Sequence, residues 1–215
     1  MHDMTTLGNQ IRDLLVSKGI ETPTHQNPID QPLVEDSFAN IMVNGLNLNL
    51  DDDSLCETPK RVAKMYCEEI FWGLDYAKFP KITVIENRMQ YDEMLVTKCQ
   101  VLSMCEHHFV PFIGQAHIAY IPSTKILGLS KFNRVTDFFS RRPQVQERLT
   151  AQIHAALSHI LETEDIAVVI QAVHYCVHLR GVKDSTSQTT TSKLSGKFKA
   201  IPEARNEFLA LTRRE

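Results

Sequence analysis

The hydrophobic pattern of this chain changes after Pro80, and this change constrains the fold more than any other feature of the sequence. Before Pro80, apolar residues recur at three- and four-residue steps, which is typical of amphipathic helices. After Pro80, extended runs rich in β-branched residues surround two further helical runs. We therefore expect an α+β fold. A helical N-terminal region would span 1–80, and an α+β domain with long strands around two central helices would span 81–215.

Helical and extended runs can be placed along the chain from this pattern. The expected helices span 6–18, 35–46, 58–71, 130–142, 143–161 and 203–212. The expected extended segments span 81–104, 115–121 and 166–179. Residues 184–192, seven of which are Ser or Thr, fit either a loop or a strand with a polar face.

The charge balance and the cysteines exclude several classes of function. The chain carries 23 basic and 26 acidic side chains, a net charge of −3, so it has no overall positive field to hold a nucleic-acid backbone. It has no apolar run long enough to span a membrane and no secretory signal at its N-terminus. Its five scattered cysteines, an odd number, indicate reduced thiols. We therefore expect a cytoplasmic protein with no nucleic-acid or membrane partner.

A candidate metal site begins at the tetrapeptide Cys105–His108, which reads Cys-Glu-His-His. A Cys and a His three positions apart can place a thiolate and an imidazole on the same small ion. If 166–179 is a strand, then His174, Cys176 and His178 share one face, and Cys176 is the natural third ligand. Thiolates combined with imidazole favour zinc.

The number of ligands distinguishes two kinds of site. Cys105, His108 and Cys176 alone would leave one position open, which is typical of catalytic zinc. His107 and His174 would then flank the ion and could move protons, because histidine titrates near neutral pH. A closed structural site, in which a neighbouring histidine is the fourth ligand, fits the spacing equally well.

A second cluster, Ser130–Arg134, lies at the start of a predicted helix. With Ser130 as N-cap and Lys131 and Arg134 beside it, the free N–H groups of the helix could bind phosphate oxygens. The alternative is a capped helix with solvated basic side chains. Further candidates for the same kind of contact, with the same weak specificity, are Arg61, Lys64 and Arg180.

Glu147 lies in the first turn of the helix expected over 143–161. A carboxylate at that position is stabilised by the helix dipole whatever its function. It could also accept two parallel hydrogen bonds from the ring N–H and the amino group of guanine, a donor pair that adenine lacks. Both interpretations stay open at this point.

Four motifs occur in order along the chain. They are 105–108 (Cys-Glu-His-His), 128–134 (Gly-Leu-Ser-Lys-Phe-Asn-Arg), 142–148 (Arg-Pro-Gln-Val-Gln-Glu-Arg) and 173–177 (Val-His-Tyr-Cys-Val). Together they resemble the GTP cyclohydrolase I family of the bacterial, zinc-dependent type, from about Leu14 to Leu211. The resemblance implies the tunnelling fold, an antiparallel sheet with two central helices. It also implies that the imidazole ring of GTP is opened with water, giving formate and 7,8-dihydroneopterin triphosphate, a precursor of folate-type pterins.

The resemblance assigns roles to the candidate residues. The implied zinc ligands are Cys105, His108 and Cys176. The implied acid–base pair is His107 and His174. The implied guanine contacts are Glu147 and, beside it, Gln146. The implied triphosphate contacts are Ser130, Lys131, Arg134 and Arg180, with Arg61 and Lys64 from another subunit. The implied assembly is a decamer of two pentameric rings with shared active sites.

The chain departs from the family pattern in two places. His178 and Leu179 stand where a lysine and a small residue are expected, and the first 30 residues match poorly. Two other functions are considered. One is a non-catalytic, zinc-stabilised protein that binds GTP or pterins. The other is a related tunnelling-fold enzyme that attacks a nitrile with a cysteine, which would need a thiol free of metal.

Overall fold

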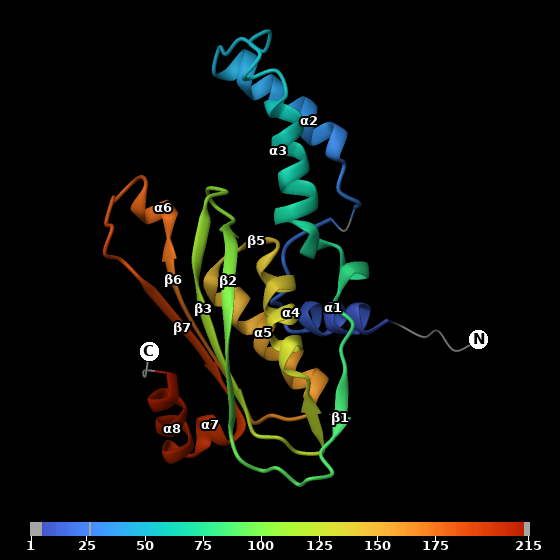
Figure 1. Ribbon diagram of the computed structural model, residues 1–215, viewed down its shortest axis with the longest axis vertical. Coiled ribbons are helices and arrows are strands. Elements are labelled where there is room, and N and C mark those ends of the chain that lie inside the picture. The colour runs from blue at the N-terminus through green and yellow to red at the C-terminus, as the bar shows by residue number, and fades with distance from the viewer. Residues whose placement is uncertain (1–5, 26, 213–215) are drawn as a thin grey trace, which may run out of the picture.

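Within residues 6–25 and 27–212, which the computed structural model describes, a five-stranded sheet forms the centre of the molecule (Figure 1). In spatial order its strands are β5 (Pro143–Gln144), β2 (Leu95–Cys105), β3 (Pro111–Tyr120), β6 (Ile166–His174) and β7 (Thr189–Leu194). Strands β2, β3, β6 and β7 pair antiparallel, and the short β5 runs parallel to the end of β2. A separate antiparallel pair joins β1 (Val84–Glu86) to β4 (Lys125–Leu127).

Helices connect and cover these strands. They are α1 (Leu7–Ser17), α2 (Gln31–Asn40), α3 (Thr58–Lys64), α4 (Leu129–Ser140), α5 (Gln146–Leu161), α6 (Tyr175–His178), α7 (Gly196–Ala200) and α8 (Pro202–Thr212). Helices α2 and α3 continue as π-helical segments, Ile41–Gly45 and Met65–Ile70, and two short 3₁₀ helices follow at Trp72–Leu74 and Tyr76–Lys78. In the part of the chain that the structure describes, no helix is both long enough and apolar enough to cross a membrane.

The main core lies between the sheet and helices α4 and α5. Strand side chains alternate between the two faces, so Val101 and Ile118 are fully buried on the helix side. Leu149, Ile153 and Leu157 of α5, the apolar stripe expected from the sequence, are also fully buried. Full burial of one such side chain contributes about 1.5–3 kcal/mol, so α5 is held firmly against the sheet.

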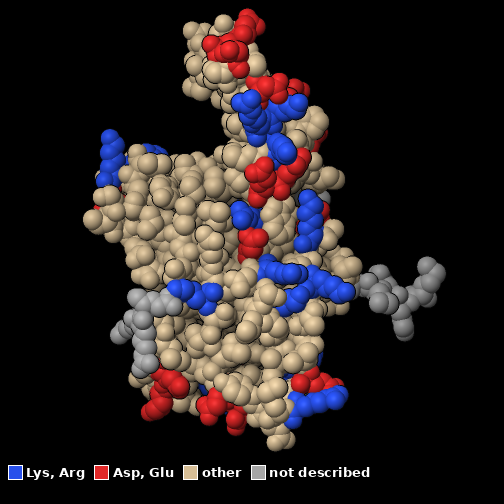
Figure 2. Space-filling model, viewed as in Figure 1, with Lys and Arg blue, Asp and Glu red and all other residues tan. Residues whose placement is uncertain are grey.

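The opposite face of the sheet is only partly covered. Helices α7 and α8 cover one end of it, where Phe198 and Phe208 are fully buried. Beyond them the face carries a row of three exposed glutamines, Gln100, Gln115 and Gln171, which are register neighbours across β2, β3 and β6. On the same face the next register pair, Leu102 and Ile113, is apolar and 36% and 37% exposed. Figure 2 shows one face of the molecule, on which Lys and Arg lie in small groups interspersed with Asp and Glu rather than in one continuous basic patch.

The helical hairpin of α2 and α3 stands away from the sheet (Figure 1). Its outer surface is apolar at several positions, and Leu33 and Leu46 are 61% and 63% exposed. The base of the hairpin packs on the turn between β2 and β3, where the rings of Tyr66 and Phe71 lie 6.1 and 5.4 Å from the ring of Phe109. The hairpin therefore contacts the body of the molecule near its base and exposes much of its apolar surface.

The α+β class and the helical N-terminal region are confirmed, but the long strand expected over 166–179 is wrong at its C-terminal end. Strand β6 ends at His174, and Tyr175–His178 forms a helical turn. His174 pairs with Phe112, one residue from the start of β3, so the ladder has almost no partner left beyond this point. The helical turn satisfies the backbone instead, and Leu179 N–H donates to the Tyr175 carbonyl at 2.9 Å. The shared strand face expected for His174, Cys176 and His178 is therefore also wrong.

Two helix starts differ from the expectation. The first central helix begins at Leu129 with Gly128 as its N-cap, so Ser130 is the second helical residue and not the cap. Pro143 lies in β5, and the second central helix begins only at Gln146. Pro143 and Gln144 pair with Met104 and Cys105 at the end of β2, so these two residues are extended and the helix starts after them.

Two other segments expected from the sequence each contain more than one structural element. The extended run expected over 81–104 contains β1 and β2 with a loop between them, and the polar tract 184–192 contains a turn followed by the first residues of β7. The domain boundary at residue 80 stays a prediction. Ile11 and Leu15 of α1 are fully buried in the same core as α4 and α5.

Candidate active site

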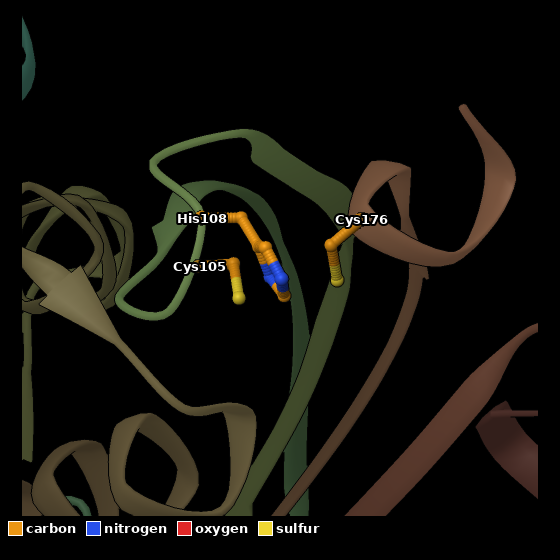
Figure 3. A group of neighbouring side chains, drawn as sticks. All are labelled: Cys105, His108 and Cys176. Carbon is orange, nitrogen blue, oxygen red and sulfur yellow. The ribbon is translucent and has the colours of Figure 1, made fainter. Parts of the chain in front are cut away.

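Cys105, His108 and Cys176 converge at one end of the sheet (Figure 3). One ligand atom from each residue lies within 4.8 Å of the other two. Cys105 is the last residue of β2, and His108 lies in the tight turn that follows it. Phe109 N–H donates to the Cys105 carbonyl at 2.9 Å, and Phe109 itself has a φ of 50°. This left-handed residue closes the turn and sets His108 beside Cys105.

Cys176 reaches the group from a different element. It is the second residue of α6, the helical turn that replaces the expected end of the strand. In Figure 3 its side chain points from α6 toward Cys105 and His108. The predicted trio is therefore brought together, although by a helical turn and not by strand alternation.

The donor set fits a soft divalent metal ion. It consists of two thiols and an imidazole, with Cys105 buried and Cys176 partly buried. Burial, and then the neighbouring Cys105 sulfur, raise the pKa of the Cys176 thiol. A bound cation would reverse this effect, because thiols bind metals as thiolates. Among the described residues this group includes no fourth His, Cys, Asp or Glu, which favours the open arrangement over the closed structural site.

His107 and His174, the expected proton carriers, have different surroundings. The His107 side chain is 65% exposed, and its Nδ1 lies 3.8 Å from Cys105 Sγ. His174 is the last residue of β6, and its ring stacks on Phe112 with centroids 4.7 Å apart. Burial lowers the pKa of His174, and the negative charge of Glu147 acts in the opposite direction.

The turn that carries Cys105 and His108 is anchored to the start of α5 by residues that sequence reasoning did not single out. Glu106 forms an ion pair with Arg148, and Arg148 Nε donates to Gln144 Oε1 at 3.2 Å. Glu106 N–H also donates to the Gln144 carbonyl at 3.0 Å. All three residues belong to the two motifs at 105–108 and 142–148, so the signal was present, but nothing in the sequence paired them.

Arg180 lies next to the candidate metal ligands. Its Nη1 is 2.7 Å from Nε2 of His108. Because a guanidinium has donors only, His108 Nε2 accepts this hydrogen bond. A cation bound through that nitrogen would displace Arg180 from it. His178, in contrast, turns toward the loop at Ser187, whose carbonyl lies 3.0 Å from His178 Nε2.

The other expected site residues differ in their exposure to solvent. Glu147, the second residue of α5, is exposed. Gln146, expected beside it at the guanine edge, is only 2% exposed, and its amide bonds to groups of the chain itself. Arg61 and Lys64 are exposed on α3.

Ser130 and Lys131 lie in the first turn of α4, and Arg134 lies in the middle of this helix. The C-terminal end of α4 is next to the end of the sheet that carries the cysteines, where Ser103 Oγ donates to the Ser140 carbonyl at 2.7 Å. Along the helix axis Ser130 is about 15 Å from Ser140, whereas Arg134 is only about 9 Å from it. Within one chain Ser130 and Lys131 are therefore separated by most of α4 from the end of the sheet that carries the cysteines.

Comparison with known proteins decides the family. The model of the family described as GTP cyclohydrolase I matches residues 34–213. The chain belongs to the GTP cyclohydrolase I family. It is 54% identical to GTP cyclohydrolase 1 of Aeromonas hydrophila, over 96% of this chain and 98% of the relative. It is 52% identical to GTP cyclohydrolase 1 of Sodalis glossinidius, over 97% of this chain and 96% of the relative.

Membership of the GTP cyclohydrolase I family confirms the resemblance read from the four motifs, and with it the tunnelling fold and an enzyme of this type. It favours the ring-opening enzyme over both other functions considered from the sequence. The matches to whole relatives also extend through the N-terminal region, in which the sequence motifs were weakest.

Proposed function

We propose that the protein opens the imidazole ring of GTP with water, releases formate and forms 7,8-dihydroneopterin triphosphate. The observation that carries this proposal is the convergence of Cys105, His108 and Cys176 next to His174 in a chain of the GTP cyclohydrolase I family. Three protein ligands leave a position for water, and a histidine two residues from a ligand can move a proton at the same centre.

The metal in this proposal is zinc. Cys105, His108 and Cys176 would hold it, because two thiolates and one imidazole are a donor set that zinc prefers. When bound, zinc would lower the pKa of water to about 7, so that water can attack a purine carbon at neutral pH. All other steps depend on side chains of the protein.

We assign the proton transfers to the two neighbouring histidines. His174 would protonate N7 of the guanine ring, which makes C8 more electrophilic. His107, which is exposed and lies beside Cys105, would serve the later proton transfers. Each such transfer contributes a factor of roughly 10²–10⁴ to the rate.

The guanine edge is assigned to Glu147. Its exposed carboxylate at the start of α5 can accept two hydrogen bonds from the N–H and NH₂ groups of guanine. Its negative charge raises the pKa of His174 against the effect of burial, which supports assigning both groups to the same site.

The triphosphate contacts require more than one chain. Arg180 lies beside His108, whereas Ser130 and Lys131 lie in the first turn of α4 and Arg134 in the middle of that helix. We therefore propose that these three residues, together with Arg61 and Lys64, act at active sites completed by neighbouring subunits.

The assembly in this proposal is a decamer of two pentameric rings. Strand β7 is an edge of the sheet, and β2 pairs on its outer side with β5 only at Met104 and Cys105. Joining β7 of one subunit to the open part of β2 in the next would extend the sheet and remove both edges. The exposed apolar residues of the α2–α3 hairpin offer a second contact surface. A cytoplasmic location is also proposed, since all five cysteines are free thiols.

A turnover assay on zinc-loaded protein tests the function. GTP should yield formate and, after oxidation and dephosphorylation, a fluorescent pterin. The Cys176→Ser variant should stay folded, bind zinc more weakly and release no formate. Zinc-loaded wild-type protein that gives neither product would refute the proposal. Unfolding of Cys176→Ser, with an inactive wild type, would instead indicate a structural zinc site in a binding protein.

A further inference from the structure

The side chain of Gln146 is buried at the junction of α5, β6 and β7. It is 2% exposed, and its amide nitrogen donates to the carbonyls of Ile170 and Thr189 at 3.0 and 3.1 Å. The same nitrogen lies 3.0 Å from Thr191 Oγ1. Backbone carbonyls can only accept hydrogen bonds, so the NH₂ end of the amide must face them. The orientation of this carboxamide is therefore determined by the chemistry of its partners.

The orientation of Gln146 determines which nitrogen of His174 carries a proton. The remaining amide atom, Oε1, has no hydrogen to give, and His174 Nε2 lies 2.7 Å from it. Nε2 must then be the donor, and in a neutral imidazole the lone pair is left on Nδ1. The ring cannot tilt freely, because it stacks on Phe112 with an angle of 9° between the two planes.

Reversing the amide would be costly. It would leave the Ile170 and Thr189 carbonyls facing an oxygen, and a buried polar group without its partner costs about 1–3 kcal/mol. Thr150, one turn further along α5, belongs to the same network. Its Oγ1 donates to the main-chain carbonyl of Gln146 at 2.8 Å and lies 2.7 Å from Thr191 Oγ1. Hydrogen bonds from α5, β6 and β7 thus hold the side chain that contacts His174.

We propose that Gln146 is a positioning residue that keeps a proton on Nε2 of His174 and leaves Nδ1 as the atom that takes up a proton from the attacking water and passes it to the substrate. This inference rests on the proposed function, since it concerns the same acid–base group. It assigns Gln146 to the histidine instead of to the guanine edge. Glu147, the next residue, faces solvent and is free to bind the base.

Two variants separate positioning from structural support. Gln146→Met keeps the length of the side chain and removes its hydrogen bonds, whereas Thr150→Val perturbs the same network without touching His174. We expect Gln146→Met to lower kcat by about 10- to 100-fold, with the KM for GTP changed by less than about 3-fold and the zinc content unchanged. Thr150→Val should keep kcat within about 2-fold of wild type and lower only stability.

The results that would overturn the inference are distinct from those that would overturn the function. A raised KM with unchanged kcat in Gln146→Met would place the carboxamide on guanine. Equal losses of kcat in both variants would make the network merely structural. In either case a wild type that still releases formate leaves the proposed function intact.

Spectroscopy on the wild type provides a test that does not depend on the folding of a Gln146 variant. Solid-state ¹⁵N NMR of histidine-labelled, zinc-loaded protein, with the His174 signals assigned by comparison with His174→Asn, reports which nitrogen is protonated. We expect the ring to carry a proton on Nε2, the nitrogen that faces Gln146 Oε1. A His174 ring without a proton on Nε2 would refute the inference whatever the kinetics.

Discussion

Arg142 is a fully buried arginine that joins the segment after α1 to the 3₁₀ helices at Trp72–Leu74 and Tyr76–Lys78. Its Nη1 donates to Glu21 Oε1 at 3.0 Å and to Tyr76 Oη at 3.2 Å, and its Nη2 donates to the Gly73 carbonyl. Its guanidinium also packs on three aromatic rings, with centroids 4.8–5.1 Å away. Glu21, which follows α1, is the anion of this pair and is 16% exposed.

Removing the carboxylate should be strongly destabilising. In Glu21→Ala the guanidinium of Arg142 stays buried without its charged partner, and losses of this kind are about 3–5 kcal/mol. The matched control is Glu86→Ala, which breaks the pair of Glu86 with Arg88, whose side chains are 75% and 87% exposed. An exposed pair contributes less than about 1 kcal/mol, so this control should barely change stability.

Urea unfolding followed by the fluorescence of Trp72 measures both variants. Trp72 is the single tryptophan of the chain, and its ring lies 5.9 Å from that of Phe138, one of the rings that Arg142 contacts. Protomer concentration and zinc must be held constant, because binding and assembly shift apparent stability. Replacing both charges, in Glu21→Ala with Arg142→Met, should cost less than the sum of the single changes. If Glu21→Ala loses no more stability than Glu86→Ala, the argument that burial makes this pair important is refuted.

Three further predictions concern titration, metal removal and guanine binding. Burial lowers the pKa of His154 from 6.5 to about 4, so the unfolded chain binds more protons than the folded chain between these values. Stability should therefore fall by up to about 3 kcal/mol as pH drops from 6.5 to 4, and urea titrations of His154→Gln should show a smaller decline. Chelation followed by aeration should oxidise Cys105 and Cys176 to a disulfide, which reduces the titratable thiols from five to three, whereas five remaining thiols would contradict the observed convergence. Glu147→Ala should raise the KM for GTP by about 10-fold or more with little change in melting temperature; a shift in melting temperature alone would support the dipole interpretation.

Much of the fold could be predicted because its elements are encoded in local patterns. The three- and four-residue steps before Pro80 and the stripe of Leu149, Ile153 and Leu157 predicted helices, and these helices are present. Element ends were less predictable. Strand β6 stops at His174 because β3 begins nearby, and α5 starts late because β5 pairs with β2. Such ends depend on partners far away in the sequence.

The candidate metal ligands Cys105, His108 and Cys176 also show what local sequence predicts and what depends on the fold. The spacing of Cys105 and His108 was enough to identify a ligand pair. Cys176 was also chosen, although by an argument from strand alternation that the helical turn of α6 overturns. The three side chains still converge, because α6 brings one ligand atom of Cys176 within 4.8 Å of those of Cys105 and His108.

By itself, the sequence determined the family, the chemical nature of the site and the order of the elements, because motifs and hydrophobic periods are properties of residues close together in the chain. Only the tertiary structure decided which groups meet. The pairing of Glu106 with Arg148, the contact of Arg180 with His108 and the separation of Ser130 from both depend on packing the strands and helices against one another. The orientation of the Gln146 amide was decided in the same way, because two carbonyls, at Ile170 and Thr189, accept its hydrogen bonds and only the folded sheet places them beside it.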